Sequence, residues 1–257
     1  MIWLGPAGTG EGSEQGLKHI KELGLDGVEI EFTYGVRMSV ETAKKLGVLA
    51  KKLGLKLSVH APYYINLASD EIEKREASMK RILDSCERGY YLTAKYIVFH
   101  AAYYGKRNKE EIYTIVKKAI LDMQRIIKKN KWDVILTPET TGKKSQFGDL
   151  DELLRLHKET GCSFCVDFAH LLARNGSIDY DEILNKLKGF KEVHCHFSGI
   201  EYSEKGERRH VITEKNDIKA LFEKLLKTKI NFMIINESPD PLGDSLKAKK
   251  VLEELKK

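Results

Sequence analysis

The sequence predicts one parallel (β/α)8 barrel over residues 1–257. Two observations favour this fold class. Short apolar or alternating segments recur eight times, and amphipathic segments with helical periodicity lie between and after them. No shift in composition marks a linker, so the eight repeats are expected to form one domain. A doubly wound open sheet is the alternative, and the regular count of eight makes it the weaker one.

The expected strands and helices alternate along the chain. The expected strands cover residues 2–8, 27–33, 56–62, 96–102, 133–140, 162–170, 192–199 and 231–239. The clearest helices cover residues 39–54, 71–92, 109–130, 149–161, 216–227 and 244–257. Gly24, Gly54 and Gly161 stand just past periodic segments, where glycine commonly ends a helix.

The composition indicates a globular protein of the cytoplasm. No uncharged apolar run approaches the length of about 18 residues that a membrane span needs, and the first ten residues lack a signal-peptide pattern. The four cysteines are expected to be reduced, and Cys162 and Cys165 would face opposite sides of their strand. A net charge of +6 is compatible with a polyanionic partner, although it is not a nucleic-acid footprint by itself.

Six consecutive expected strands end in a residue that can bind a metal ion. These residues are His60, His100, Glu139, Asp167, His196 and Glu237. The carboxyl ends of barrel strands meet at one rim, where the acids would repel each other unless a cation lay between them. Histidine nitrogen with carboxylate oxygen suits Zn²⁺, with Mn²⁺ as an alternative. The set is too large for one tetrahedral ion, and Glu139 in the middle strand could bridge two.

Several segments resemble the endonuclease IV family. They are LSVHAPYYINLAS, VFHAAYYG, PETTGKKSQFG, CVDFAH, VHCHFSG and INESPD. The resemblance runs from about residue 15 to residue 250 and implies a TIM barrel with a trinuclear zinc cluster. It also implies a monomeric enzyme that cleaves double-stranded DNA 5′ to an abasic site and leaves a 3′-hydroxyl, in base-excision repair.

The resemblance assigns roles to individual residues. The residues that match metal ligands are His60, His100, Glu139, Asp167, His170, His196, His210 and Glu237. Glu139 would be both the bridging ligand and the catalytic residue. Tyr63, with Tyr64 beside it, matches an aromatic side chain that inserts into the DNA base stack, and Arg37 falls where the family presents an intercalating arginine. The other interpretation of the two tyrosines is that they pack under a rim loop.

The chain departs from the family at the third metal position. Arg208 stands where the family has an aspartate, and an arginine cannot ligate a metal. Either Glu207 takes its place, or the third position is vacant and Arg208 binds a phosphate group. Two or three ions are therefore expected. His194, inside the barrel two residues before His196, has no settled role.

Two other functions remain open. The first is a sugar isomerase or epimerase of the same superfamily, whose single-metal pattern Glu139, Asp167, His196 and Glu237 would satisfy. Glu29 and Glu31 lie in a segment that the sugar enzymes also contain, and they could line the barrel bottom, pair with lysines or approach the site. The second is a nucleic-acid-binding barrel without catalysis, with Lys143, Lys144 and Lys205 among its phosphate contacts.

Overall fold

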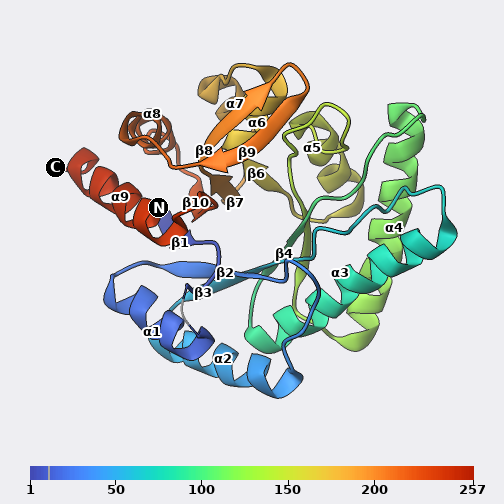
Figure 1. Ribbon diagram of the computed structural model, residues 1–257, viewed down its shortest axis with the longest axis horizontal. Helices are drawn as coiled ribbons and strands as arrows, with labels where there is room; N and C mark the ends of the chain where they lie inside the picture. The colour runs from blue at the N-terminus through green and yellow to red at the C-terminus, as the bar shows by residue number, and fades with distance from the viewer. Residues whose placement is uncertain (11) are drawn as a thin grey trace.

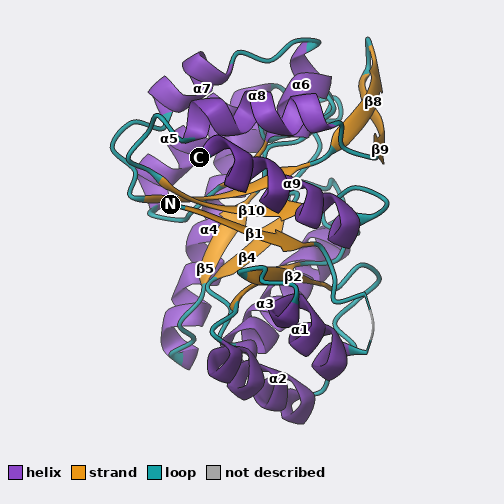
Figure 2. Cartoon of the chain, turned by 90° about the vertical axis from the view of Figure 1, so that its left-hand side faces the viewer, coloured by secondary structure: helices purple, strands orange, loops and turns teal. Residues whose placement is uncertain are grey.

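The computed structural model describes residues 1–10 and 12–257 of the 257-residue chain. Eight parallel strands form the barrel, and helices surround it (Figures 1 and 2). The barrel strands are β1 (Ile2–Pro6), β2 (Gly27–Glu31), β3 (Lys56–His60), β4 (Tyr96–Phe99), β5 (Ile135–Pro138), β6 (Cys165–Asp167), β7 (Glu192–Phe197) and β10 (Asn231–Asn236). Bridges between Ala7 and Glu29 and between Glu139 and Cys165 join the two four-stranded halves, which closes the ring. The predicted fold class is confirmed.

Nine helices lie within the described residues. They are α1 (Ser13–Glu22), α2 (Val40–Leu53), α3 (Ile72–Leu92), α4 (Lys109–Asn130), α5 (Leu150–Thr160), α6 (Phe168–Asn175), α7 (Tyr180–Lys186), α8 (Lys215–Leu225) and α9 (Pro241–Leu255). Local chemistry fixes several ends. Asp149 and Glu152 form a capping box at the start of α5, and Gly161 ends this helix in the left-handed conformation. In residues 1–10 and 12–257, no helix is long and apolar enough to cross a membrane.

All eight strands are shorter than predicted, and in two of them the structure shows what ends the strand. The segment 162–170 is a strand only from Cys165 to Asp167, because the Asp167 carboxylate accepts from the His170 backbone N–H at 2.7 Å and starts α6. The segment 192–199 ends as a barrel strand at Phe197. The chain then forms an antiparallel hairpin of β8 (Gly199–Ser203) and β9 (Gly206–Val211), which projects from the carboxyl end of the barrel (Figure 2). The hairpin is polar and was not predicted.

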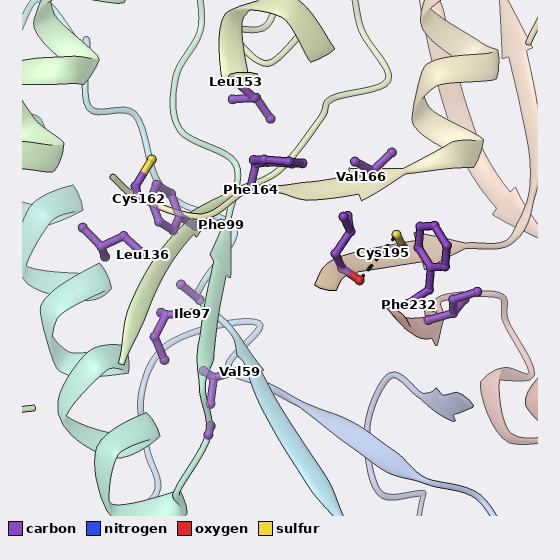
Figure 3. Packing of buried hydrophobic residues seen from close by; sticks show 14 of the residues in the cluster. Val59, Ile97, Phe99, Leu136, Leu153, Cys162, Phe164, Val166, Cys195 and Phe232 are labelled. Atoms are coloured by element: carbon purple, nitrogen blue, oxygen red, sulfur yellow. Dashed lines mark hydrogen bonds between the residues drawn. The ribbon is translucent and has the colours of Figure 1, made fainter. Parts of the chain in front are cut away.

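The apolar core lies between the strands and the helices. Ile97, Phe99, Val166 and Cys195 point outward into this layer, as the strand alternation predicts (Figure 3). Cys162 belongs to the same layer. Cys165 instead packs with Tyr96 and Val98 in a separate cluster, so the two cysteines occupy different layers.

Inside the barrel, the layer below the mouth carries buried polar side chains. Glu29, Ser58, Thr137 and His194 are each at most 1% exposed. Barrel interiors are usually filled by branched apolar side chains. This polar layer lies directly under the predicted metal ligands.

Candidate metal centre and substrate cavity

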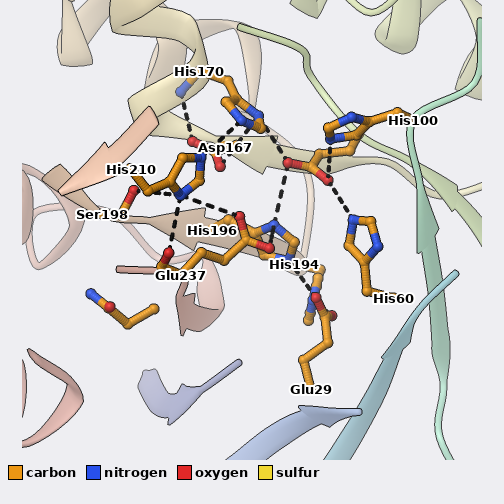
Figure 4. Close-up of polar contacts among 12 residues, drawn as sticks. Glu29, His60, His100, Asp167, His170, His194, His196, Ser198, His210 and Glu237 are labelled. Carbon is orange, nitrogen blue, oxygen red and sulfur yellow. Dashed lines mark hydrogen bonds and ion pairs between the residues drawn. The ribbon is translucent and has the colours of Figure 1, made fainter. Parts of the chain in front are cut away.

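The eight predicted metal ligands gather at the carboxyl end of the barrel. Figure 4 shows seven of them by label, converging from strands, helix α6 and the hairpin. A cavity of about 500 Å³ opens here, with His60, His100, His170, His210 and Glu237 in its wall. Glu139, Asp167 and His196 are at most 1% exposed and form the floor of the cluster.

Glu139 follows β5 and faces two histidines with one oxygen. The Nε2 atoms of His60 and His100 lie 3.2 Å and 3.1 Å from Glu139 Oε2. The Nδ1 of His60 lies 2.8 Å from the carbonyl oxygen of Ala61, where an N–H would donate. Its Nε2 lone pair then faces a carboxylate, so a proton or a cation must lie between them. Burial opposes that proton, but Glu139 and Glu31 raise the pKa of His60 to about 10.

The other oxygen of Glu139 faces a second group. Nδ1 of His196 lies 3.3 Å from Glu139 Oε1 and 3.2 Å from Glu237 Oε1. Together with Asp167, these residues offer ligand atoms that all lie within 4.8 Å of one another. Burial above all raises the pKa of Asp167, whereas His196 outweighs the burial of Glu237 and lowers its pKa to about 2. Three carboxylates at one point repel each other, and a divalent cation would relieve that repulsion.

A third group forms between α6 and the hairpin. The Nε2 atoms of His170 and His210 lie 3.2 Å apart. Each ring has its Nδ1 near a carbonyl oxygen, 2.9 Å from that of Thr140 and 3.1 Å from that of Glu237. Two Nε2 lone pairs would then face each other, which again requires a proton or a cation between them. The Glu207 oxygens lie 3.6 Å from His170 Nε2 and 4.0 Å from His210 Nε2.

A β-bulge decides which side chain completes this third group. The pairing of β9 with β8 shifts between Glu201 and Tyr202, which leaves Arg208 as an extra residue. On a regular strand, residues 207 and 210 would face opposite sides. The extra residue reverses the alternation, so Glu207 and His210 face the same side. Glu207 thus lies in the cluster, and Arg208 is exposed outside it.

The donor sets fit divalent cations. Each of the three groups combines imidazole nitrogen with carboxylate oxygen, as zinc and related metals prefer. Burial alone would raise the pKa of the Glu139 carboxyl, but His100 and His196 hold it well below its usual value. Glu139 is therefore ionised and contributes one oxygen to each of two groups.

The predicted aromatic wedge is exposed. Tyr63 and Tyr64 are 56% and 65% exposed, so they do not pack under a rim loop. Tyr63 lines the cavity, and its ring centroid lies 6.0 Å from that of His60. Tyr64 lies next to it on the rim, outside the cavity wall.

Arg37 and His194 lie outside the cavity. Arg37 is exposed and lines a neighbouring hollow of about 350 Å³, which shares Glu31 and Thr33 with the cavity wall. His194 is fully buried inside the barrel, where its Nε2 lies 3.0 Å from Glu29 Oε2. Arg37 thus lies away from the clustered ligands, whereas His194 lies next to His196, and these two histidines and Cys165 have ligand atoms within 4.8 Å of one another.

The sequence left the place of Glu31 open and gave no role to Ser198. Glu31, at the end of β2, lines the cavity, and burial raises the pKa of its carboxyl to about 8, with Glu29 and Glu237 adding to the shift. The alternation of β2 puts Glu29 and Glu31 on the interior face, which could have identified it. Ser198 places its hydroxyl 3.0 Å from His210 Nδ1. No sequence pattern signals that contact, because the hairpin creates it.

Known proteins resemble this chain in sequence. The uncharacterized protein MJ0133 of Methanocaldococcus jannaschii is 40% identical over 236 residues, which cover 84% of each chain. A protein of Mycobacterium leprae named probable endonuclease 4 is 28% identical over 203 residues, covering 77% of this chain and 78% of its own length. The resemblance to endonuclease IV proteins is thereby confirmed, at low identity.

Solved structures share the fold. The 3-keto-D-glucoside 4-epimerase YcjR of E. coli aligns with a TM-score of 0.74 at 17% identity, over 99% of this chain and all (100%) of its own. Endonuclease IV of Thermus thermophilus aligns with a TM-score of 0.71 at 21% identity, over 99% and 97% of the two chains. At these identities the structures support the barrel and do not choose between the two chemistries. The family model described as xylose isomerase-like TIM barrel matches residues 17–257, and the chain belongs to that family.

Proposed function

We propose that the chain is a zinc-dependent endonuclease of one domain that cleaves DNA 5′ to an abasic site and leaves a 3′-hydroxyl. It would act as a monomer in base-excision repair in the cytoplasm. The observation that carries the proposal is the position of Glu139. Its Oε2 lies within 3.2 Å of His60 and His100, and its Oε1 lies within 3.3 Å of His170 and His196. This arrangement supports a bridge between two cations, and a site with several ions suits phosphodiester cleavage.

Three groups of residues would hold the ions. The first is His60, His100 and Glu139; the second is Glu139, Asp167, His196 and Glu237; the third is Asp167, His170 and His210, with Glu207 beside its two rings. Glu207 takes the position that Arg208 cannot serve. Zinc, when bound, would act as a Lewis acid that stabilises charge on phosphoryl oxygens, and it would lower the pKa of a bound water molecule to about 7.

Residues of the chain would hold the metal-binding groups in fixed positions. Glu139 fixes the distance between the first and second groups of residues, because its Oε2 contacts His60 and its Oε1 contacts His196. His60 and His170 are held from behind by the carbonyl oxygens of Ala61 and Thr140, which point both rings into the cluster. This preorganised arrangement would stabilise the negative charge that develops on a phosphodiester as it is cleaved.

The rim residues would bind the DNA. The exposed Tyr63 lines the cavity and would occupy the space left by a missing base, with Tyr64 beside it. An inserted aromatic ring offsets part of the cost of unstacking, which is about a few kcal/mol per step. Arg37 and Arg208 are exposed cations and would contact backbone phosphates.

Single-turnover cleavage of an oligonucleotide duplex with one abasic site tests this proposal. The zinc content should be measured on the same sample. We expect a single nick 5′ to the lesion, a 3′-hydroxyl product and two or three zinc ions per chain. Glu139→Gln should abolish nicking while circular dichroism shows an unchanged fold. Nicking by this variant at a near-normal rate would contradict the role of Glu139.

A sugar isomerase or epimerase is the second candidate. Glu139, Asp167, His196 and Glu237 form a complete group by themselves. Glu31 adds a carboxyl to the wall of a cavity of about 500 Å³, which is large enough for a small sugar. One tightly bound ion per chain, with aldose or ketose turnover and no nicking, would select this function. Tight binding to an abasic duplex in the presence of zinc, without nicking, would instead select a non-catalytic binding protein.

A further inference from the structure

Glu29 lies inside the barrel, one layer below the metal ligands. Its side chain is fully buried, and its carboxylate reaches two histidines of β7 (Figure 4). Oε1 lies 2.9 Å from Nε2 of His196, and Oε2 lies 3.0 Å from Nε2 of His194. A carboxylate in such a place is strongly disfavoured unless charged or polar partners surround it. The buried Glu29 carboxylate is therefore stabilised by the two imidazole rings, and in turn it holds their Nε2 atoms in place.

His196 presents its two nitrogens to opposite layers. Nδ1 faces the metal group, 3.2 Å from Glu237 Oε1 and 3.3 Å from Glu139 Oε1. Nε2 faces Glu29. A neutral imidazole carries one proton, so the nitrogen that holds it decides whether the ring can bind a metal through Nδ1. Nδ1 also lies beside two carboxylates, so a cation in the metal group is what turns its lone pair outward, and Glu29 then holds the proton at Nε2.

We propose that Glu29 is a positioning residue that fixes the tautomer and orientation of His196. The inference rests on the proposed metal site, since it explains how one of its ligands is held. His194 contacts the second oxygen of Glu29 and so prevents the carboxylate from rotating away. His194 thus has a supporting role and is not a ligand. Carboxylates behind metal-binding histidines commonly act in this way, and their loss weakens metal binding by about 10–100-fold.

Glu29→Gln tests the inference because it keeps the volume of the side chain and removes its charge. Ser58→Ala is the matched control. Ser58 pairs with Glu29 across β2 and β3, is equally buried, and its hydroxyl has no hydrogen-bond partner within residues 1–10 and 12–257. The first measurement is a long-range proton–nitrogen NMR spectrum of the histidine rings, recorded with zinc bound and with zinc removed, with the signals of His196 identified through His196→Asn.

We expect wild type and Ser58→Ala to keep a proton on Nε2 of His196 with zinc bound and with zinc removed, and Glu29→Gln to shift it toward Nδ1 when zinc is removed, because Glu139 and Glu237 remain beside Nδ1. The second measurement is zinc affinity by competition with a chelator. Glu29→Gln should bind zinc about 10–100-fold more weakly at one position, with the same number of ions at saturation. Ser58→Ala should match wild type. If Glu29→Gln does not fold, Glu29→Asp keeps the charge with a shorter reach and should show the same two changes in smaller measure.

Three results would separate the possibilities. An unchanged tautomer and affinity in the Glu29 variant would overturn the inference while leaving the metal site intact. The loss of one ion at saturating zinc would overturn it as well, because Glu29 would then be a ligand. A wild-type protein that binds no zinc would contradict the proposed function, whereas the NMR comparison would still report on the contact between Glu29 and His196.

Discussion

The backbone N–H of Glu207 donates to the carbonyl oxygen of Gly142 over 3.0 Å, and a Cβ on Gly142 would lie 2.6 Å from the Cβ of Glu207. The loop after β5 thus touches the hairpin with no room for a side chain. This contact holds Glu207 against His170. The two segments lie far apart in the sequence. Because a side chain at position 142 would collide with Glu207, glycine is required there for Glu207 to approach His170.

Gly142→Ala should displace Glu207 and weaken the third metal position. The added methyl group cannot fit unless the hairpin moves, and Glu207 then loses its place near His170 and His210. We expect one fewer zinc ion per chain after buffer exchange, measured by atomic emission. Gly105→Ala offers a control, because nothing lies within 4 Å of a Cβ there, although its positive φ adds some strain. Full zinc content in Gly142→Ala would argue against Glu207 as a ligand.

Glu207→Gln and Arg208→Gln should have opposite effects. Glu207 lies in the cluster, so its loss of charge should lower the zinc content by one ion. Arg208 lies outside, so its substitution should preserve zinc and weaken DNA binding. If Arg208 contacts a phosphate, its loss should reduce by about 1 the slope of log binding constant for DNA against log salt concentration. Zinc analysis and fluorescence anisotropy at several salt concentrations check both outcomes. Loss of zinc in the arginine variant would reverse the assignment.

Tyr63→Ala should reduce affinity for abasic duplex more than for intact duplex. The exposed ring lines the cavity and would stack at the lesion. Stacking of one base on an aromatic ring contributes about 1–3 kcal/mol, which corresponds to roughly 5–150-fold in affinity. Tyr90→Ala removes another exposed ring, on α3, and should leave both affinities unchanged. Equal loss for the two duplexes would show that Tyr63 does not read the lesion.

Asp244 should make stability depend on pH in acid. This buried carboxylate accepts from the Thr213 backbone N–H and from Lys247, each at 2.6 Å. Burial opposes ionisation, but Lys247 and Thr213 lower the pKa of Asp244 below its ordinary value. Its stabilising contribution is therefore complete above the unfolded pKa of about 3.9 and is lost as the pH falls through the lower folded pKa.

Asp244→Asn should accordingly lower the free energy of unfolding by about 2 kcal/mol at pH 7. The gap between wild type and variant should close as the pH drops below about 4. Urea unfolding at several pH values measures it. Glu254→Gln, at an exposed ion pair with Lys215, should leave stability nearly unchanged throughout. A gap that persists at low pH would show that the charge of Asp244 is not the cause.

Strand periodicity predicted much of the candidate site. His60, His100, Asp167 and His196 lie at strand ends on the interior face, and a parallel barrel brings such ends to one rim. The same alternation accounts for Cys195, which points to the helices. These results follow from local rules, because a strand's direction and its side-chain period determine where each end residue points.

Strand periodicity could not predict the hairpin of β8 and β9 or its bulge. A bulge inserts one residue into a pairing between β8 and β9, and the sequence of a polar segment does not reveal the register of that pairing. The same applies to Ser198, which meets His210 only because the hairpin folds back. Glu31 was visible as an acid on β2, but its place in the cavity wall depends on the neighbouring strands.

The sequence by itself determined the barrel and the residue types at its rim, since both depend on short-range periodicity and on the shared direction of parallel strands. Only the tertiary structure decided that Glu207 and not Arg208 faces His170, and that Glu29 supports His196 from below. Those choices depend on a register between two strands and on contacts between segments far apart in the sequence. The register and these contacts form only when distant segments pack together, so no local sequence pattern predicts them.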